Sequence, residues 1–122
     1  NGFAIPHGQF IIELLGLLSR NGQEKKFILR FADYLSRLQE YGEDAIQGRR
    51  SSMEHLNGEQ YLCSMRCNFS ASNVRILFAY INNKVYLLLA FSEKKGHRTT
   101  EYAAFCPEAK QRLQDMLKEE EE

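Results

Sequence analysis

A run of seven residues, "VYLLLAF" (residues 85–91), constrains the fold of this chain more than any other segment. It contains no charged side chain, and apolar residues occupy both of its alternating faces. A strand of this composition has to be covered on both faces of its sheet. The sequence therefore predicts a central strand at 84–91, with other elements packed above and below it.

Two earlier segments, at 59–67 and 74–81, have the alternation of strands with one apolar face. Asn82 and Asn83 tolerate positive φ and predict a tight hairpin turn into the central strand. The stretch "NFSASN" predicts a turn or bulge between the first two strands. Hairpin connections make the sheet antiparallel. The polar stretch at 43–58 is expected to be a loop.

Three segments have the apolar spacing of helices, at 10–18, at 23–41 and from Pro107 onward. A short turn at Asn21-Gly22 separates the first two, and Gly42 ends the second. We therefore expect an α+β fold, in which an N-terminal helical hairpin packs on a small antiparallel sheet of three to four strands. A C-terminal helix completes this fold.

The length of 122 residues fits one domain, which we place at 1–118, before an acidic tail at 119–122 that we expect to be frayed. Three cysteines without a CxxC spacing argue against a disulfide framework and against a zinc site. No apolar run approaches the ~20 residues of a membrane helix, and no secretory leader is visible. We expect a cytoplasmic protein with no membrane partner.

Basic residues gather after the central strand, which continues into "FSEKKGHRTTEY" (91–102) with Lys94, Lys95, His97, Arg98 and Tyr102. Arg66 and Arg75 interrupt the two earlier strands, and antiparallel pairing brings them to the same edge of the sheet as this segment. Cations collected at one edge are suited to hold a phosphate. A purely structural interpretation of these residues stays open. In that interpretation, segment 91–102 is a solvated turn, and Arg66 and Arg75 form salt bridges to Glu59 or Glu93.

The chain has a formal net charge of zero, although sixteen basic residues face only twelve acidic ones before the terminal "EEEE". A local basic patch on a nearly neutral protein suits a site better than a general coat for nucleic acid.

Three stretches carry a resemblance to a known family: "HLNGEQYLCSMR", "NVRILFAYINNKVYLLLAFSEKK" and "TTEYAAFCPEAKQRL". Their order resembles the RelE/ParE superfamily of toxins from bacterial type II toxin–antitoxin systems, and most closely its HigB-like, phage-derived branch. The resemblance covers roughly residues 10–117. The chain departs from the family in three respects. Many ribonucleases of the family are strongly basic, and this chain is not. The usual N-terminal strand of the family is missing or reduced to "FAI", and "TTEYAAF" lengthens the link to the last helix, which could move Tyr102 away from the site.

The resemblance implies a metal-free endoribonuclease without a cofactor, which cleaves mRNA, commonly on the ribosome. The RNA 2′-hydroxyl attacks the adjacent phosphate in such enzymes, so they need a base, an acid and cations. Arg66 and Arg75 would hold the phosphate, and Lys94 or Lys95 would add charge or act as base. Tyr102 would stack on a base or move a proton. His97 and His55 are further acid or base candidates, and Arg98 and His55 are candidates for substrate binding.

The resemblance also implies a protein partner, a cognate antitoxin of the helix-turn-helix type. Two alternatives to the nuclease stay open. A ParE-like toxin acts by binding DNA gyrase, and a degenerate relative would bind only its antitoxin.

Overall fold

The computed structural model of the protein describes residues 2–22, 24–47, 52–68, 73–93 and 101–121. Its helices are α1 (Gly8–Asn21), α2 (Glu24–Tyr41) and α3 (Cys106–Glu121), with the short 3-10 helices η1 (Gly42–Ala45) and η2 (Tyr102–Ala104). Its strands are β1 (Ala4–Pro6), β2 (Met53–His55), β3 (Leu62–Asn68), β4 (Asn73–Ile81) and β5 (Lys84–Glu93). The class is α+β, as the sequence predicts.

The five strands form one mixed sheet in the order β1-β5-β4-β3-β2. The β2–β3–β4–β5 ladder is antiparallel, whereas β1 pairs with β5 in parallel. The expectation of three to four antiparallel strands is therefore wrong, because the sequence pattern predicts neither β1 nor β2. Each has three residues, which is too short for an alternating pattern to stand out. β2 lies inside the stretch expected to be a loop, and β1 overlaps "FAI".

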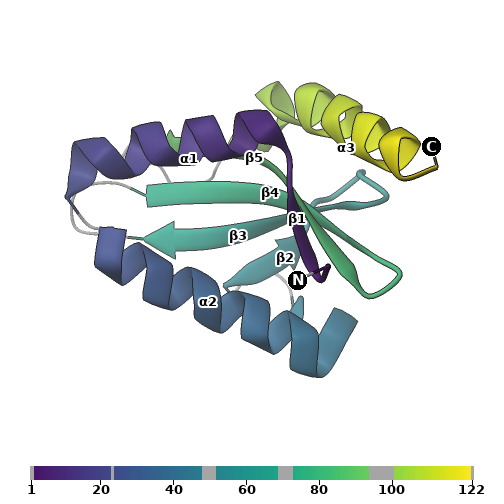
Figure 1. Ribbon diagram of the computed structural model, residues 1–122, viewed down its shortest axis with the longest axis horizontal. Helices are drawn as coiled ribbons and strands as arrows, with labels where there is room; N and C mark the ends of the chain where they lie inside the picture. Colours follow the sequence, from purple (N-terminus) through teal and green to yellow (C-terminus); the bar gives the residue numbers. More distant parts are fainter. Residues whose placement is uncertain (1, 23, 48–51, 69–72, 94–100, 122) are drawn as a thin grey trace.

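The helices form two layers around the sheet (Figure 1). α1 packs on β5 and α2 packs on β3 over one face, while α3 packs on β5 over the other face. The expected N-terminal helical hairpin is wrong in detail. β1 precedes the two helices, and they diverge from the turn at Gly22, because each buries its apolar side against a different strand of a wide sheet (Figure 1).

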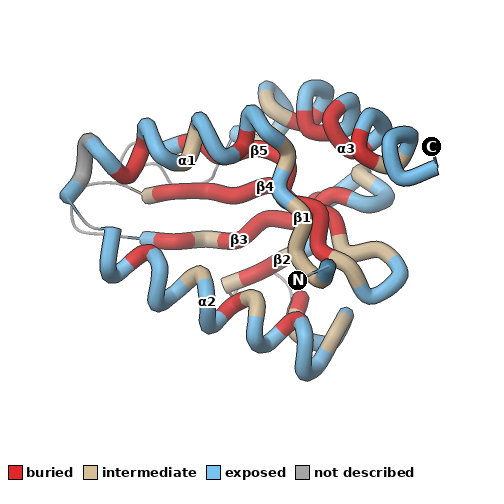
Figure 2. Tube along the Cα trace, viewed as in Figure 1, coloured by how far each residue is buried: buried red, intermediate tan, exposed pale blue. Residues whose placement is uncertain are grey.

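β5 is covered on both faces, as its composition predicts, and it lies buried from Val85 to Phe91 (Figure 2). The pairing register with β4 shifts between Leu77 and Phe78, where Leu88 is the extra residue. This bulge lets the sequence neighbours Leu88 and Leu89 both join the core beneath α3.

α3 continues through Glu121, so most of the stretch expected to be a frayed tail belongs to its last turn. Glu120 accepts a hydrogen bond from the Tyr86 hydroxyl at 3.0 Å and contacts Lys84 Nζ at 3.4 Å. Burial and this hydrogen bond raise the pKa of Tyr86 to about 12. These contacts tie the end of α3 to the start of β5. Within the described part of the chain, none of the helices has the length and apolar character of a membrane span.

Candidate functional site

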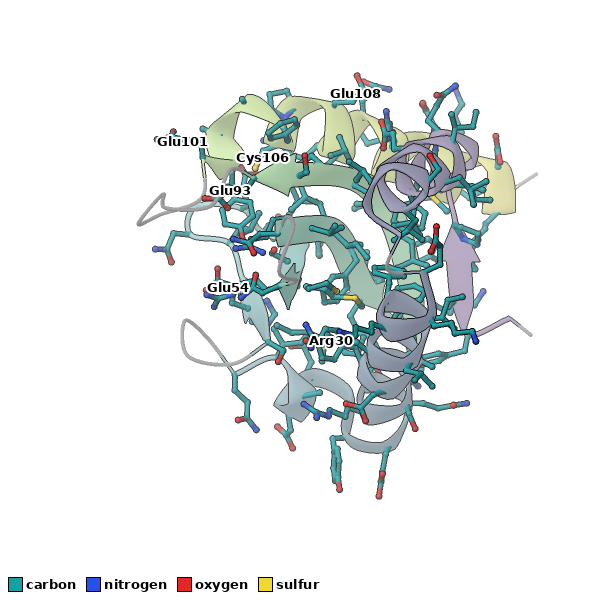
Figure 3. All side chains as sticks on the ribbon, turned by 90° about the vertical axis from the view of Figure 1, so that its left-hand side faces the viewer. Arg30, Glu54, Glu93, Glu101, Cys106 and Glu108 are labelled. Atoms are coloured by element: carbon teal, nitrogen blue, oxygen red, sulfur yellow. The ribbon has the colours of Figure 1, made fainter. Side chains whose placement is uncertain are left out.

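Six polar residues lie on the face of the sheet that α1 and α2 do not cover. We call them the polar cluster: Glu54, Ser64, Arg66, Arg75, Glu93 and Tyr102. Side chains of a strand alternate between faces, so Ser64 and Arg66 share the face of the core residue Leu62, and Arg75 shares the face of Leu77. Glu54 and Glu93, labelled in Figure 3, lie on the side away from α1 and α2.

The centre of the cluster is a pair of arginines on adjacent strands. Arg66 of β3 lies directly opposite Arg75 of β4 in the antiparallel register. The structure therefore brings these two sequence-predicted site residues together. Like charges directly opposite each other across two strands are destabilising unless they are compensated.

Two glutamates supply this compensation. Arg66 Nη2 lies 3.2 Å from Glu54 Oε2, and Arg75 Nε lies 3.4 Å from Glu93 Oε2. Arg75 Nη1 also donates to Asn68 Oδ1 at 2.7 Å. The two ion pairs make the cluster nearly neutral, so a phosphate has to compete with carboxylates for the guanidinium groups.

The interpretation that these arginines form structural salt bridges to Glu59 or Glu93 is confirmed for Arg75 only. Arg75 pairs with Glu93, as that interpretation expects, but Arg66 pairs with Glu54 and Glu59 pairs with Lys110 at 3.0 Å. Accessibility separates the two arginines. The side chain of Arg66 is 26% exposed and that of Arg75 is 8% exposed. Arg66 is the arginine that an external anion reaches first.

Tyr102 stays at the cluster despite the longer link that precedes α3. Its hydroxyl shares a hydrogen bond of 2.8 Å with Ser64 Oγ, and Ser64 precedes Arg66 by two residues on the same face. The Tyr102 ring packs edge-on against Phe91, which stacks on Phe105 at 3.9 Å between ring centroids. Aromatic packing and one hydrogen bond therefore hold this tyrosine beside the arginines.

His55 lies on the other face of the sheet, outside the polar cluster. Its Nδ1 is 3.3 Å from Cys63 Sγ, and its Nε2 is 3.0 Å from Glu43 Oε2. The order cysteine, histidine, carboxylate matches that of nucleophilic cysteine enzymes. However, burial and the nearby Glu43 raise the pKa of Cys63 to about 12, so the thiol stays protonated at neutral pH and is not a nucleophile. The contacts of His55 with Cys63 and Glu43 link β2 to β3 and to η1.

Four further candidates, Lys94, Lys95, His97 and Arg98, lie outside the described residues. The described chain stops at Glu93, which pairs with Asn73, and it resumes before Tyr102. Glu93 and Tyr102 belong to the polar cluster, and Glu101 is the first described residue after the gap. The roles given to these four residues stay predictions.

Two cluster members were not singled out from the sequence. Glu54 lies in the stretch expected to be a loop, and Ser64 is a single polar residue in an apolar strand. The isolated serine was the available signal, since a buried hydroxyl needs a hydrogen-bond partner. Its partner, Tyr102, is 38 residues away.

Among the described residues, no group of metal ligands marks the polar cluster. Across the described ranges, His, Cys, Asp and Glu side chains form no group of three that could hold a metal ion. A cavity of about 250 Å³ lies elsewhere, between the end of α2, η1 and β2, where Arg37 and Tyr41 line it. The chemistry available at the cluster is that of guanidinium, carboxylate and hydroxyl groups.

No protein-family model matches this chain, and neither the curated proteins nor the solved structures include a match to it. The resemblance described above therefore stays a hypothesis, and function is argued from the geometry of the polar cluster.

Proposed function

We propose that this protein is a toxin of a type II toxin–antitoxin system that cleaves mRNA, on the ribosome, as a metal-free endoribonuclease. The observation that carries the proposal is the placement of Arg66 directly opposite Arg75, with Tyr102 and Glu54 on the same face. Attack of a 2′-hydroxyl on the neighbouring phosphate needs cations for the developing charge and groups that move protons. The polar cluster and the resemblance together supply these groups.

In this proposal the arginines bind and stabilise the phosphate. Arg66 makes the first contact because it is the more exposed of the two. The incoming phosphate displaces Glu54 from Arg66, and a guanidinium can hold two phosphate oxygens at once. Arg75 is held by Glu93 and Asn68 beneath the surface. It adds positive charge at the phosphorane that forms.

The displaced Glu54 is also suited to take the proton of the 2′-hydroxyl. A carboxylate can act as a general base, and Glu54 lies beside the guanidinium that would hold the phosphate. Lys94, Lys95 and His97 stay candidates for the base and for the acid that protonates the leaving oxygen, and Arg98 for RNA binding. Tyr102 offers a ring for stacking and a hydroxyl for proton transfer. His55 takes no part at this face, because it contacts Glu43 and Cys63 on the other.

A second candidate function is a toxin that acts by binding protein alone, as ParE-like relatives do with gyrase. Two observations favour it. Both arginines are already paired with glutamates, and α1 and α2 expose large apolar side chains, among them Ile12 and Leu29. In either case we expect neutralisation by a helix-turn-helix antitoxin.

Inducible expression in a bacterial host separates the candidates. Wild type is compared with Arg66→Ala/Arg75→Ala, and both growth of the host and new mRNA 5′ ends are measured. Arg66→Gln is included because it leaves the buried Arg75–Glu93 pair intact, and Arg37→Ala is the matched control, since Arg37 is an exposed arginine paired with Asp33 on α2. The nuclease proposal expects arrest and cleavage in wild type and Arg37→Ala, with both lost in the other variants. Arrest with intact mRNA would support protein binding instead.

A further inference from the structure

The outer face of α1 is apolar and uncharged although it is exposed. From Gly8 to Ser19 the only charged residue is Glu13, and its carboxylate is engaged by Arg112. Ile12 and Leu15 are 63% and 62% exposed. Surface helices of globular proteins usually carry charged or polar residues on this side.

The composition of α1 is that of a helix covered all around, yet the fold covers only the side that faces β5. Phe10, Leu17 and Leu18 are buried there. The remaining apolar side chains, Ile11, Ile12 and Leu15, form a stripe with Gly8 and Gly16 at its ends. Contiguous exposed apolar surface of this kind marks an interaction site.

We propose that a second copy of this chain covers this stripe, and that two α1 helices pack antiparallel about a two-fold axis at Ile12. A partner whose own face carries charge finds no countercharge within this stripe, whereas a second copy brings the same uncharged surface. The zero formal net charge of the chain also removes long-range repulsion between copies.

The charges on α2 select the antiparallel arrangement. Lys25 and Lys26 are exposed at the start of α2, directly after the end of α1. A parallel pair would bring both lysine clusters together. In an antiparallel pair they lie at opposite ends of a 14-residue helix, about 20 Å apart at 1.5 Å per residue. That separation exceeds the screening length of about 8 Å at physiological ionic strength.

The residue spacing of α1 suits the antiparallel contact. With Ile12 on the axis, Ile12 meets Ile12 of the partner copy, and Leu15 lies over the partner's Gly8. An isologous contact needs this reciprocity, and a glycine leaves room for a large side chain. Nothing lies within 4 Å of the position where a Cβ would stand on Gly8 or Gly16.

One helix face is smaller than the roughly 800 Å² per partner of a standard interface. We therefore expect a weak dimer that forms at high protein concentration. The polar cluster lies on the opposite face of the sheet, so the dimer leaves it accessible, and the inference does not rest on the proposed function.

Sedimentation of the full chain over a wide concentration range tests the proposal, with Ile12→Glu, Ile12→Lys and the control Gln114→Glu. Ile12 and Gln114 are both exposed helix residues, so circular dichroism should show unchanged folding. Wild type and Gln114→Glu should dimerise, and each Ile12 variant alone should dimerise at least tenfold more weakly. An equimolar mixture of Ile12→Glu and Ile12→Lys should form a heterodimer, because position 12 then meets its opposite charge.

Wild type that stays monomeric at every concentration would overturn the proposal and leave the stripe to another partner. Dimerisation that persists in both Ile12 variants would overturn it by placing the interface elsewhere. Loss of dimers without recovery in the mixture would overturn the two-fold axis at Ile12.

Discussion

Arg112 and Glu13 form a two-pronged ion pair that joins α3 to α1 across the edge of β5. Arg112 Nη1 and Nη2 each lie 2.8 Å from a Glu13 carboxylate oxygen. The same two side chains bind the backbone of β5, where Arg112 donates to Leu88 O at 2.8 Å and Glu13 accepts from Ala90 N at 3.1 Å. β1 pairs with β5 from Val85 to Leu87, so the ion pair continues the edge hydrogen bonding where β1 ends.

We expect Arg112→Met to lower the free energy of unfolding by about 3 kcal/mol, because it removes the cation that pairs with Glu13 and the donor to the Leu88 carbonyl. Urea denaturation measures this change. Arg37→Met is the matched control. It breaks the exposed Arg37–Asp33 pair at 2.7 Å and should cost less than about 0.5 kcal/mol. Equal losses in the two variants would contradict the role assigned to Arg112.

The hydrogen bond between Ser64 and Tyr102 should make their substitutions non-additive. Tyr102→Phe leaves the Ser64 hydroxyl, which is 0% exposed, without its partner, and should cost about 1–2 kcal/mol. Ser64→Ala/Tyr102→Phe removes both groups and should cost less than the two single variants together. A double-mutant cycle by urea denaturation gives the coupling. Additive losses would mean that Tyr102 is held by Phe91 alone.

Buried thiols should make stability fall at alkaline pH. Burial raises the pKa of Cys63 and of Cys67 from 9.0 to about 12. A group whose pKa is raised by folding stabilises the fold fully below its unfolded pKa and loses this contribution as pH rises toward its folded pKa. Between pH 9 and 12 each thiol should therefore lower the unfolding free energy by about 1.4 kcal/mol per pH unit. Urea titrations under reductant should show this slope reduced in Cys63→Ala/Cys67→Ala, and an unchanged slope would contradict the assignment.

Two glycines should respond to alanine with opposite signs. Gly42 ends α2 at φ +59°, and a Cβ there would lie 3.2 Å from the Tyr80 hydroxyl, so Gly42→Ala should destabilise the protein by about 1 kcal/mol or more. Gly16 lies within α1, where nothing is within 4 Å of an added Cβ, so Gly16→Ala should stabilise it by about 0.5–1 kcal/mol. Thermal unfolding at low protein concentration measures the shift in midpoint temperature for each variant. A shift in the same direction for both would count against this account of Gly42.

Local patterns in the sequence were enough for the elements that depend on near neighbours. The three helices and strands β3, β4 and β5 lie where periodicity predicts them. The turn at Asn82-Asn83 adopts φ of 51° and 62°, and Gly42 adopts positive φ as a helix end. Asparagine and glycine accept this conformation at low cost, so residue type alone indicates these positions.

The parts decided only by the tertiary structure depend on residues far apart in the chain. β1 is a strand because β5 lies beside it, and β2 because β3 does. Strand pairing inferred from the sequence predicts that Arg66 and Arg75 lie at one edge of the sheet. The sequence could not show that Glu54 would pair with Arg66 or that Ser64 would form a hydrogen bond with Tyr102. Ion pairs and hydrogen bonds form wherever folding places the groups within reach, and a three-residue strand or a single glutamate carries no local periodicity that announces its partner.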